Sequence, residues 1–158
     1  MTRGAALTYA GKPADAIFDL SLSITLKRDN FDAYYFRGLA HEALGSRDQA
    51  RRDYAKALSL LNSSIDGTPR DCFVYMQRGA VFERTGREDQ AIADETRALA
   101  MDCPGPADAH VYRGLAYDRK GLRAKAAADL QSAVRINKFS KLGWNWMKRL
   151  DARLAVHR

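Results

Sequence analysis

The chain has 158 residues, of which 46% are hydrophobic and 28% are charged, and its net charge is +7. This composition excludes an intrinsically disordered chain, and apolar runs of only a few residues exclude a membrane-spanning helix. The start of the chain has too short an apolar stretch for a signal peptide, so we expect a cytoplasmic protein.

The charge is unevenly distributed along the chain. Residues 1–118 carry 15 basic and 17 acidic side chains, whereas residues 119–158 carry 11 basic and 2 acidic ones, a net of +9. A basic end of this kind is either a solvated terminus or a surface for an acidic partner, an anionic membrane or nucleic acid.

One unit is written four times in the chain. Each copy has an Arg-Gly dipeptide, a second glycine seven residues after the first, and an alanine five residues later. The copies begin at Arg3-Gly4, Arg37-Gly38, Arg78-Gly79 and Arg113-Gly114. The spacings between the first glycines are 34, 41 and 35 residues. A period near 34 residues indicates a repeat architecture, in which each second glycine ends a helix and begins the turn to the next.

The repeats predict pairs of helices in chain order. The expected pairs are 2–10 with 13–27, 31–44 with 47–61, 71–85 with 88–101, and 107–120 with 123–136. The polar stretch at 62–71 is expected to be a turn-rich insert that accounts for the seven extra residues of the second period. A ninth helix is expected at 140–156, where Trp144, Met147, Leu150 and Leu154 form one apolar stripe.

These motifs resemble tetratricopeptide repeats of the bacterial type. The resemblance rests on Tyr34 to Ala40, Gly45, Ala50 and Asp53, and on the matching residues of the later copies. It implies an all-α, right-handed α-solenoid of antiparallel helix pairs, with about four repeats of which the first is incomplete, and a capping helix. We expect a single domain over 1–158, in repeats at about 1–30, 31–62, 72–103 and 107–138. The short first repeat also fits a fragment of a longer array.

An aspartate follows each repeated arginine by sixteen residues. The expected pairs are Arg3 with Asp19, Arg37 with Asp53, Arg78 with Asp94, and Arg113 with Asp129. A charged side chain at a semi-buried helix position is costly unless it is paired, and guanidinium geometry suits a carboxylate. We interpret these pairs as structural links, the alternative being that the arginines face an acidic ligand.

The search for catalytic or metal-binding residues finds little. His41, His110 and His157 lack metal spacing, and His41 and His110 fall at positions that other repeats fill with large apolar or aromatic residues. We therefore predict no enzyme activity, no metal and no cofactor. Cys72 and Cys103 lie 31 residues apart and are expected to be free thiols. They lie near the two ends of one helix pair, however, so a disulfide is geometrically conceivable.

The resemblance implies that the first helices line a concave groove. The predicted ligand-binding residues are Tyr35, Leu39, Glu42, Met76, Glu83, Arg84, Val111, Asp118, Arg119, Asn145 and Arg149. We expect a non-enzymatic module that binds a peptide or helix of an unidentified protein there. The alternatives are binding of nucleic acid or a membrane surface through the basic end, which is less expected, and a regulatory piece of a larger protein. A homodimer through residues 1–12 is also conceivable.

One residue departs from the repeat pattern inside a helix pair. Glu95 occupies the position that Leu20, Tyr54 and Leu130 fill in the other repeats. This substitution indicates either a less well-packed third pair or a local polar contact.

Overall fold

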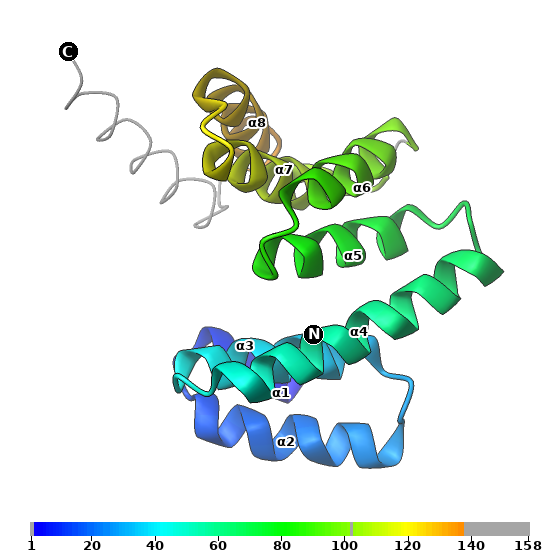
Figure 1. The fold of residues 1–158 in the computed structure, drawn as a ribbon, viewed down its shortest axis with the longest axis vertical. Coiled ribbons are helices and arrows are strands. Elements are labelled where there is room, and N and C mark those ends of the chain that lie inside the picture. Colours follow the sequence, from blue (N-terminus) through cyan, green and yellow to red (C-terminus); the bar gives the residue numbers. More distant parts are fainter. Residues whose placement is uncertain (1, 102, 138–158) are drawn as a thin grey trace. The chain divides into compact units, whose positions relative to one another are not determined.

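The computed structural model describes residues 2–101 and 103–137 and contains only α-helices in those ranges (Figure 1). The helices are α1 (Arg3–Tyr9), α2 (Pro13–Leu26), α3 (Phe31–Ala43), α4 (Arg47–Gly67), α5 (Cys72–Arg84), α6 (Glu88–Ala100), α7 (Ala107–Arg119) and α8 (Arg123–Ile136). The chain divides into two compact units, residues 1–69 with α1 to α4 and residues 70–158 with α5 to α8. The expected helix at 140–156 lies outside the described residues.

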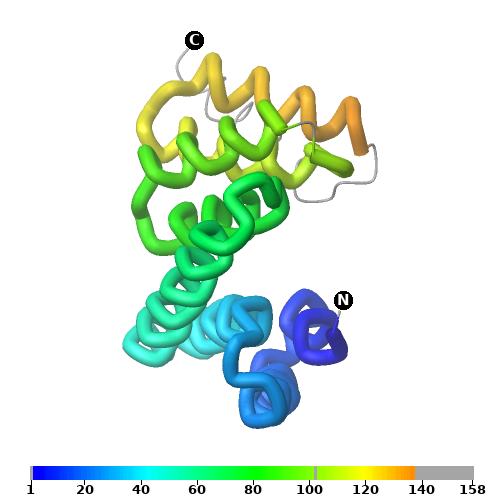
Figure 2. Tube along the Cα trace, turned by 90° about the vertical axis from the view of Figure 1, so that its right-hand side faces the viewer, coloured from blue at the N-terminus to red at the C-terminus, as the bar shows by residue number. Residues whose placement is uncertain are grey.

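Each unit is built from two helix pairs. In the first unit α1 packs on α2 and α3 packs on α4, and α3 also contacts both helices of the first pair. The second unit repeats this arrangement, with α7 packed against α5, α6 and α8. Figure 2 shows the helices following one another in antiparallel order within each unit. The all-α solenoid of helix pairs is therefore confirmed, whereas the expectation of one domain over the whole chain stays a prediction.

The turn inside each pair depends on the second glycine. Gly11, Gly45, Gly86 and Gly121 have φ between 72° and 74°, in the left-handed region that L-residues other than glycine adopt at a cost. The backbone N–H of Ser46, one residue beyond Gly45, donates to the carbonyl of His41 over 2.8 Å, which closes the end of the helix. These glycines let two helices of one pair reverse direction within three residues.

The close approach of the paired helices depends on the first glycine. A Cβ placed on Gly38 would lie 2.6 Å from the ring of Tyr54, and one on Gly4 would lie 2.6 Å from Leu20 Cγ. Both large side chains are almost completely buried against the glycine that faces them. The large residue of the second helix therefore fills the space that the missing side chain leaves.

Helix α4 is longer than predicted. It was expected to end at residue 61 and continues to Gly67, so the stretch 62–67 is helical rather than a loop. Seven extra residues are close to two turns of 3.6 residues, so the helix continues without rotating its buried face. The Ser64 hydroxyl donates to the Leu60 carbonyl over 3.0 Å, and the helix stops at Thr68, which precedes Pro69.

Cys72 and Cys103 form a disulfide, so the expectation of free thiols was wrong. Their Cα atoms lie 5.8 Å apart, within the range that a disulfide requires. Cys72 is the first residue of α5, and Cys103 follows the end of α6. Antiparallel packing of these two helices brings the start of one and the end of the other together.

Candidate functional site

The repeated arginines are bonded to the repeated aspartates in all four copies. Arg37 donates through Nε and Nη2 to the two carboxylate oxygens of Asp53, over 2.9 and 2.7 Å. The same two-bond arrangement joins Arg78 to Asp94, Arg113 to Asp129, and Arg3 to Asp19. The last three of the four aspartates along the chain are buried. Each of these guanidinium groups is bonded to a carboxylate of the second helix of its own pair.

Two of these arginines also reach the preceding helix pair. Arg37 Nη1 donates to Ser21 Oγ over 3.1 Å, and Arg113 Nη1 donates to Thr96 Oγ1 over 3.1 Å. Hydrogen bonding to Asp53 raises the pKa of Arg37, and hydrogen bonding to the partner aspartate likewise raises the pKa of Arg113. Each of the two arginines therefore connects three successive helices while fully charged.

The two histidines in the described residues join the same clusters. His110 Nδ1 lies 2.8 Å from Asp129 Oδ1, so this carboxylate bonds both a histidine and an arginine. His41 Nε2 lies 3.9 Å from Asp53 Oδ2, and burial lowers the pKa of the His41 imidazole. Both side chains are half-buried. No group of residues able to hold a metal ion occurs in residues 2–101 and 103–137.

Among the described residues, Glu95 is a buried carboxyl group without a hydrogen-bond partner. It is fully buried, and neither carboxylate oxygen has a hydrogen-bond partner. A Cβ on Gly79 would lie 2.3 Å from Glu95 Oε1, so the side chain lies directly over the glycine of α5. Burial raises the pKa of Glu95 well above its ordinary value, and the neighbouring Asp94 adds to the increase.

The predicted groove residues of the first unit differ in accessibility. Tyr35 is only 7% exposed, and its ring packs edge-on against Phe36 with centroids 5.3 Å apart. Glu42 accepts a hydrogen bond from the Tyr54 hydroxyl over 2.7 Å and is half-buried. Leu39 is half-buried as well. Tyr35 is therefore part of the packed interior, and Leu39 and Glu42 remain partly accessible on α3.

The second unit shows the same division. Val111 and Glu83 are 1% and 2% exposed, so neither contributes to an open surface. Arg119 donates to the Glu83 carboxylate over 2.7 Å and thereby joins α7 to α5. Met76 is half-buried, and its sulfur lies 3.5 Å from the sulfur of Cys103.

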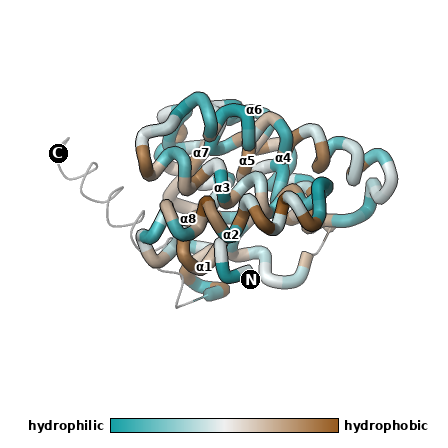
Figure 3. Tube along the Cα trace, turned by 90° about the horizontal axis from the view of Figure 1, so that it is seen from below, coloured by the Kyte–Doolittle hydropathy of each residue, from teal (hydrophilic) through white to brown (hydrophobic). Residues whose placement is uncertain are grey.

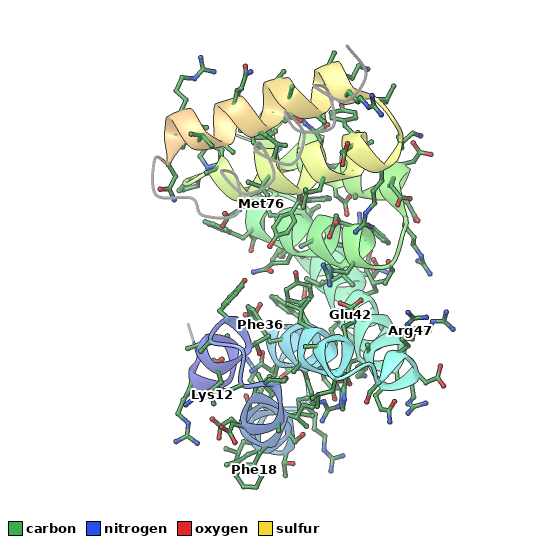
Figure 4. The ribbon with its side chains drawn as sticks, turned by 90° about the vertical axis from the view of Figure 1, so that its left-hand side faces the viewer. Lys12, Phe18, Phe36, Glu42, Arg47 and Met76 are labelled. Atoms are coloured by element: carbon green, nitrogen blue, oxygen red, sulfur yellow. A yellow bond between two sulfur atoms is a disulfide. The ribbon has the colours of Figure 1, made fainter. Side chains whose placement is uncertain are left out.

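The remaining predicted groove residues are placed as follows. Arg84 is exposed at the end of α5, and Asp118 is half-buried near the end of α7. Asn145 and Arg149 lie outside the described residues. Figure 4 labels Glu42 on α3 and Met76 on α5.

An apolar surface that the sequence reasoning did not identify lies on α2. Phe18, Leu22 and Leu26 are 73%, 53% and 80% exposed, at intervals of four residues. A cavity of about 330 Å³ adjoins this surface and is lined by Arg3, Leu7, Asp15, Phe18 and Asp19. The signal was present in the sequence, because residues 13–26 contain no lysine or arginine whereas the outer face of the second repeat carries Arg52 and Lys56.

Among the described residues, no helix combines the length and the apolar character that crossing a bilayer needs.

Comparison with known proteins identifies the repeat and the fold. Residues 31–60 match the family described as tetratricopeptide repeat. "DnaJ homolog subfamily C member 3" of Rattus norvegicus is 30% identical over 97 residues, which are 61% of this chain and 19% of that protein. The chain therefore spans about a fifth of the length of the curated relatives it matches.

Two solved structures share the fold. One is described as the first TPR of Spaghetti (RPAP3) bound to an HSP90 peptide, with 17% identity and a TM-score of 0.61 over 79% of this chain and 93% of the other. The other is PilW, described as a type IV pilus biogenesis factor, with 18% identity and a TM-score of 0.67 over 94% of this chain and 66% of the other.

Proposed function

Because residues 31–60 match a tetratricopeptide repeat and the fold is shared with tetratricopeptide-repeat structures, we propose that the chain is a non-enzymatic module that holds a peptide segment of another protein against its first helices. The RPAP3 domain that shares the fold is described as bound to an HSP90 peptide, and this supports a peptide as the type of ligand. Stacked helix pairs offer extended surfaces that take peptides or helices.

The observation that carries the proposal is that charged side chains of the first helices are bonded within the protein, whereas apolar ones remain partly exposed. The arginines of α3, α5 and α7 are bonded to their aspartates, and Glu83 is bonded to Arg119. Leu39 and Met76 nevertheless remain partly exposed on the same helices. A ligand would therefore be held mainly by apolar contacts, and Arg84, Asp118 and Arg119 lie at or near the ends of α5 and α7.

The burial of three predicted groove residues restricts the proposed ligand contacts to the remaining ones. Tyr35, Glu83 and Val111 support the surface from below, because they are buried. The proposed contact residues of the first unit are Leu39 and Glu42. Those of the second unit are Met76, Arg84, Asp118 and Arg119. The preferred ligand is a short segment with apolar anchors, which would contact the half-buried Leu39 or Met76.

The test uses peptides selected from a random display library on the full chain and measured by fluorescence anisotropy. Leu39→Asp and Met76→Asp are each expected to weaken binding at least about tenfold, because a carboxylate in an apolar contact must be desolvated. The matched controls are Ala55→Asp and Ala93→Asp, which place the same charge at exposed positions of α4 and α6. Equal loss in the controls, or no loss in Leu39→Asp and Met76→Asp with helical content unchanged, would refute the proposal.

Nucleic-acid binding through residues 119–158 is the competing function, and the net charge of +9 in that stretch is the observation that favours it. It is tested on the same protein with labelled single-stranded DNA at increasing salt. A protein that binds phosphates loses affinity steeply with salt, because counterions are released on binding. Affinity for DNA that is steep in salt and unaffected by Leu39→Asp would favour this function over the peptide-binding one.

A further inference from the structure

The outer face of α2 carries a continuous apolar stripe. Phe18, Leu22 and Leu26 are each more than half exposed and recur every four residues, so they lie along one side of the helix. Figure 4 shows Phe18 projecting away from the helices of its unit, and Figure 3 shows hydrophobic residues along α2 from the side on which this helix lies. The stripe is about 12 Å long at 1.5 Å per residue.

No other repeat has this stripe. The equivalent positions are Arg52, Lys56 and Leu60 in α4, Ala93, Arg97 and Met101 in and after α6, and Ala128, Ser132 and Ile136 in α8. The first two positions therefore carry basic, small or polar residues in the later repeats, as expected for a helix face in water. Only α2 places large apolar side chains at both of them.

Neighbouring repeats do not cover this face. In the second unit the pair α7–α8 follows the pair α5–α6. The α8 residues at the stripe positions, Ala128 and Ile136, are exposed although this preceding pair is present. In the first unit α2 is followed by α3 and α4, and the stripe is exposed despite these neighbours. If a further helix pair preceded α1, it would pack on the pair α1–α2 as the pair α5–α6 packs on the pair α7–α8. Because α5 and α6 leave the corresponding face of α8 exposed, such a pair would also leave the α2 stripe exposed. The stripe is therefore suited to contact with another molecule.

The charges around the stripe suit a second copy of the same chain. Helix α2 has Asp15 and Asp19 in its first half and no basic residue, whereas the turn after it has Lys27, Arg28 and Asp29, a net of +1. If two α2 helices lie antiparallel across a two-fold axis, Leu22 meets Leu22 of the second copy, and Phe18 meets Leu26. The acidic half of each helix then faces the basic turn of the other.

The cavity beside the stripe fits this arrangement. Its apolar wall is formed by Leu7 and Phe18, and its polar side is lined by Asp15 and by the Arg3–Asp19 ion pair. A long basic side chain can bury its stem against apolar groups while its charge reaches a carboxylate. Asp19 is already bonded to Arg3, which leaves Asp15 as the carboxylate nearest to the incoming cation in this pairing.

We infer that the protein self-associates through the apolar stripe of α2, as an antiparallel two-fold dimer in which Arg28 of each copy faces Asp15 of the other. Three side chains per copy are fewer than a standard interface of about 800 Å² per partner provides. The association is consequently weak and depends on concentration. It shares the cavity residues Arg3 and Leu7 with the 1–12 surface, and a dimer through that surface stays a separate prediction.

The test is sedimentation velocity of the full chain over a concentration series. The wild-type protein is expected to shift from monomer to dimer with rising concentration. Phe18→Arg with Leu22→Lys copies the residues that α4 carries at the same positions, and it is expected to raise the dissociation constant at least about tenfold. Ala128→Arg with Ser132→Lys adds the same charge at the equivalent positions of α8 and is expected to leave the dissociation constant unchanged. Circular dichroism checks that all variants keep their helical content.

A charge-exchange experiment distinguishes self-association from other contacts. Asp15→Lys alone and Arg28→Asp alone each place like charges opposite one another in the dimer and are each expected to weaken it. An equimolar mixture of the two variants restores two opposite-charge contacts and is expected to associate like the wild type. The inference is overturned by a wild type that stays monomeric at about 1 mM, where even millimolar affinity would be detected. It is also overturned by a mixture that associates no better than either variant alone, or by equal weakening in the α8 control.

Discussion

Replacing Glu95 with leucine is expected to stabilise the second unit. The change removes a carboxyl group that is fully buried and has no hydrogen-bond partner. Leucine already occupies the equivalent position in two other repeats, where Leu20 lies over Gly4 and Leu130 over Gly114. The substitution therefore gives α6 a side chain that the same local architecture accommodates elsewhere in this molecule.

The expected size of the effect is about 2–4 kcal/mol in the free energy of unfolding. Leaving a polar group buried without a partner costs about 1–3 kcal/mol, and more if it is charged. Burying an aliphatic side chain in its place adds a favourable contribution of about 1.5–3 kcal/mol relative to an exposed one. Repacking of a branched side chain over Gly79 opposes these gains by about 1 kcal/mol.

The assay is urea unfolding followed by circular dichroism, at several values of pH and with Glu95→Gln as the control. The pKa of Glu95 is raised in the folded state, so the folded chain binds a proton that the unfolded chain has released. Its contribution to stability is therefore fully present below the ordinary glutamate pKa and is lost as the pH rises toward the folded-state value. Both Glu95→Leu and Glu95→Gln are expected to remove this loss of stability with rising pH.

Two results would refute the reasoning. An unfolding free energy of Glu95→Leu at or below that of the wild type would mean that Glu95 is satisfied by a partner. A wild-type pH profile that matches that of Glu95→Gln would mean that the carboxyl is not held in its neutral form.

Two further predictions concern the scaffold. Arg78→Met is expected to lower the free energy of unfolding by about 3 kcal/mol, because it leaves the buried Asp94 unpaired. Arg3→Met is expected to leave the urea midpoint unchanged, since Arg3 is largely exposed. Equal effects of the two variants would contradict a structural role of the buried pair. Reduction of the Cys72–Cys103 disulfide with dithiothreitol is expected to lower the unfolding free energy by about 3.7 kcal/mol, as closing a loop with a sequence separation of 31 implies. The same treatment is expected to have no effect on a Cys72→Ala, Cys103→Ala double variant, and two titratable thiols in the untreated native protein would contradict the prediction.

Much of the fold follows from periodicity alone. Glycine and proline mark the turns, so the bounds of seven helices agree with expectation to within one residue, and the sixteen-residue offset identifies the Arg–Asp partners. The end of α4 could not be inferred in the same way, because Asn62, Ser63 and Ser64 favour a turn by composition. In the helix the Ser63 and Ser64 hydroxyls donate to backbone carbonyls four residues earlier. Tertiary context overrides weak local propensity at such positions.

The candidate site was less predictable than the fold. Periodicity gives the side of a helix on which a residue lies but not how deeply its neighbours cover it, so Tyr35 and Val111 were expected at the surface and are buried. Spacing likewise gave the helix pair to which Cys72 and Cys103 belong but not the separation of their Cα atoms. These properties depend on the packing of several helices at once.

The arginines that reach three helices have a consequence for how the repeats fold. Arg37 connects α2, α3 and α4, and Arg113 connects α6, α7 and α8, so part of the stability of each repeat exists only while its neighbour is folded. In a linear array this corresponds to a nearest-neighbour coupling energy between repeats. Partial unfolding that begins at one helix pair is then transmitted to the next, and the amide hydrogens of adjacent pairs within a unit should exchange with solvent as one cooperative block.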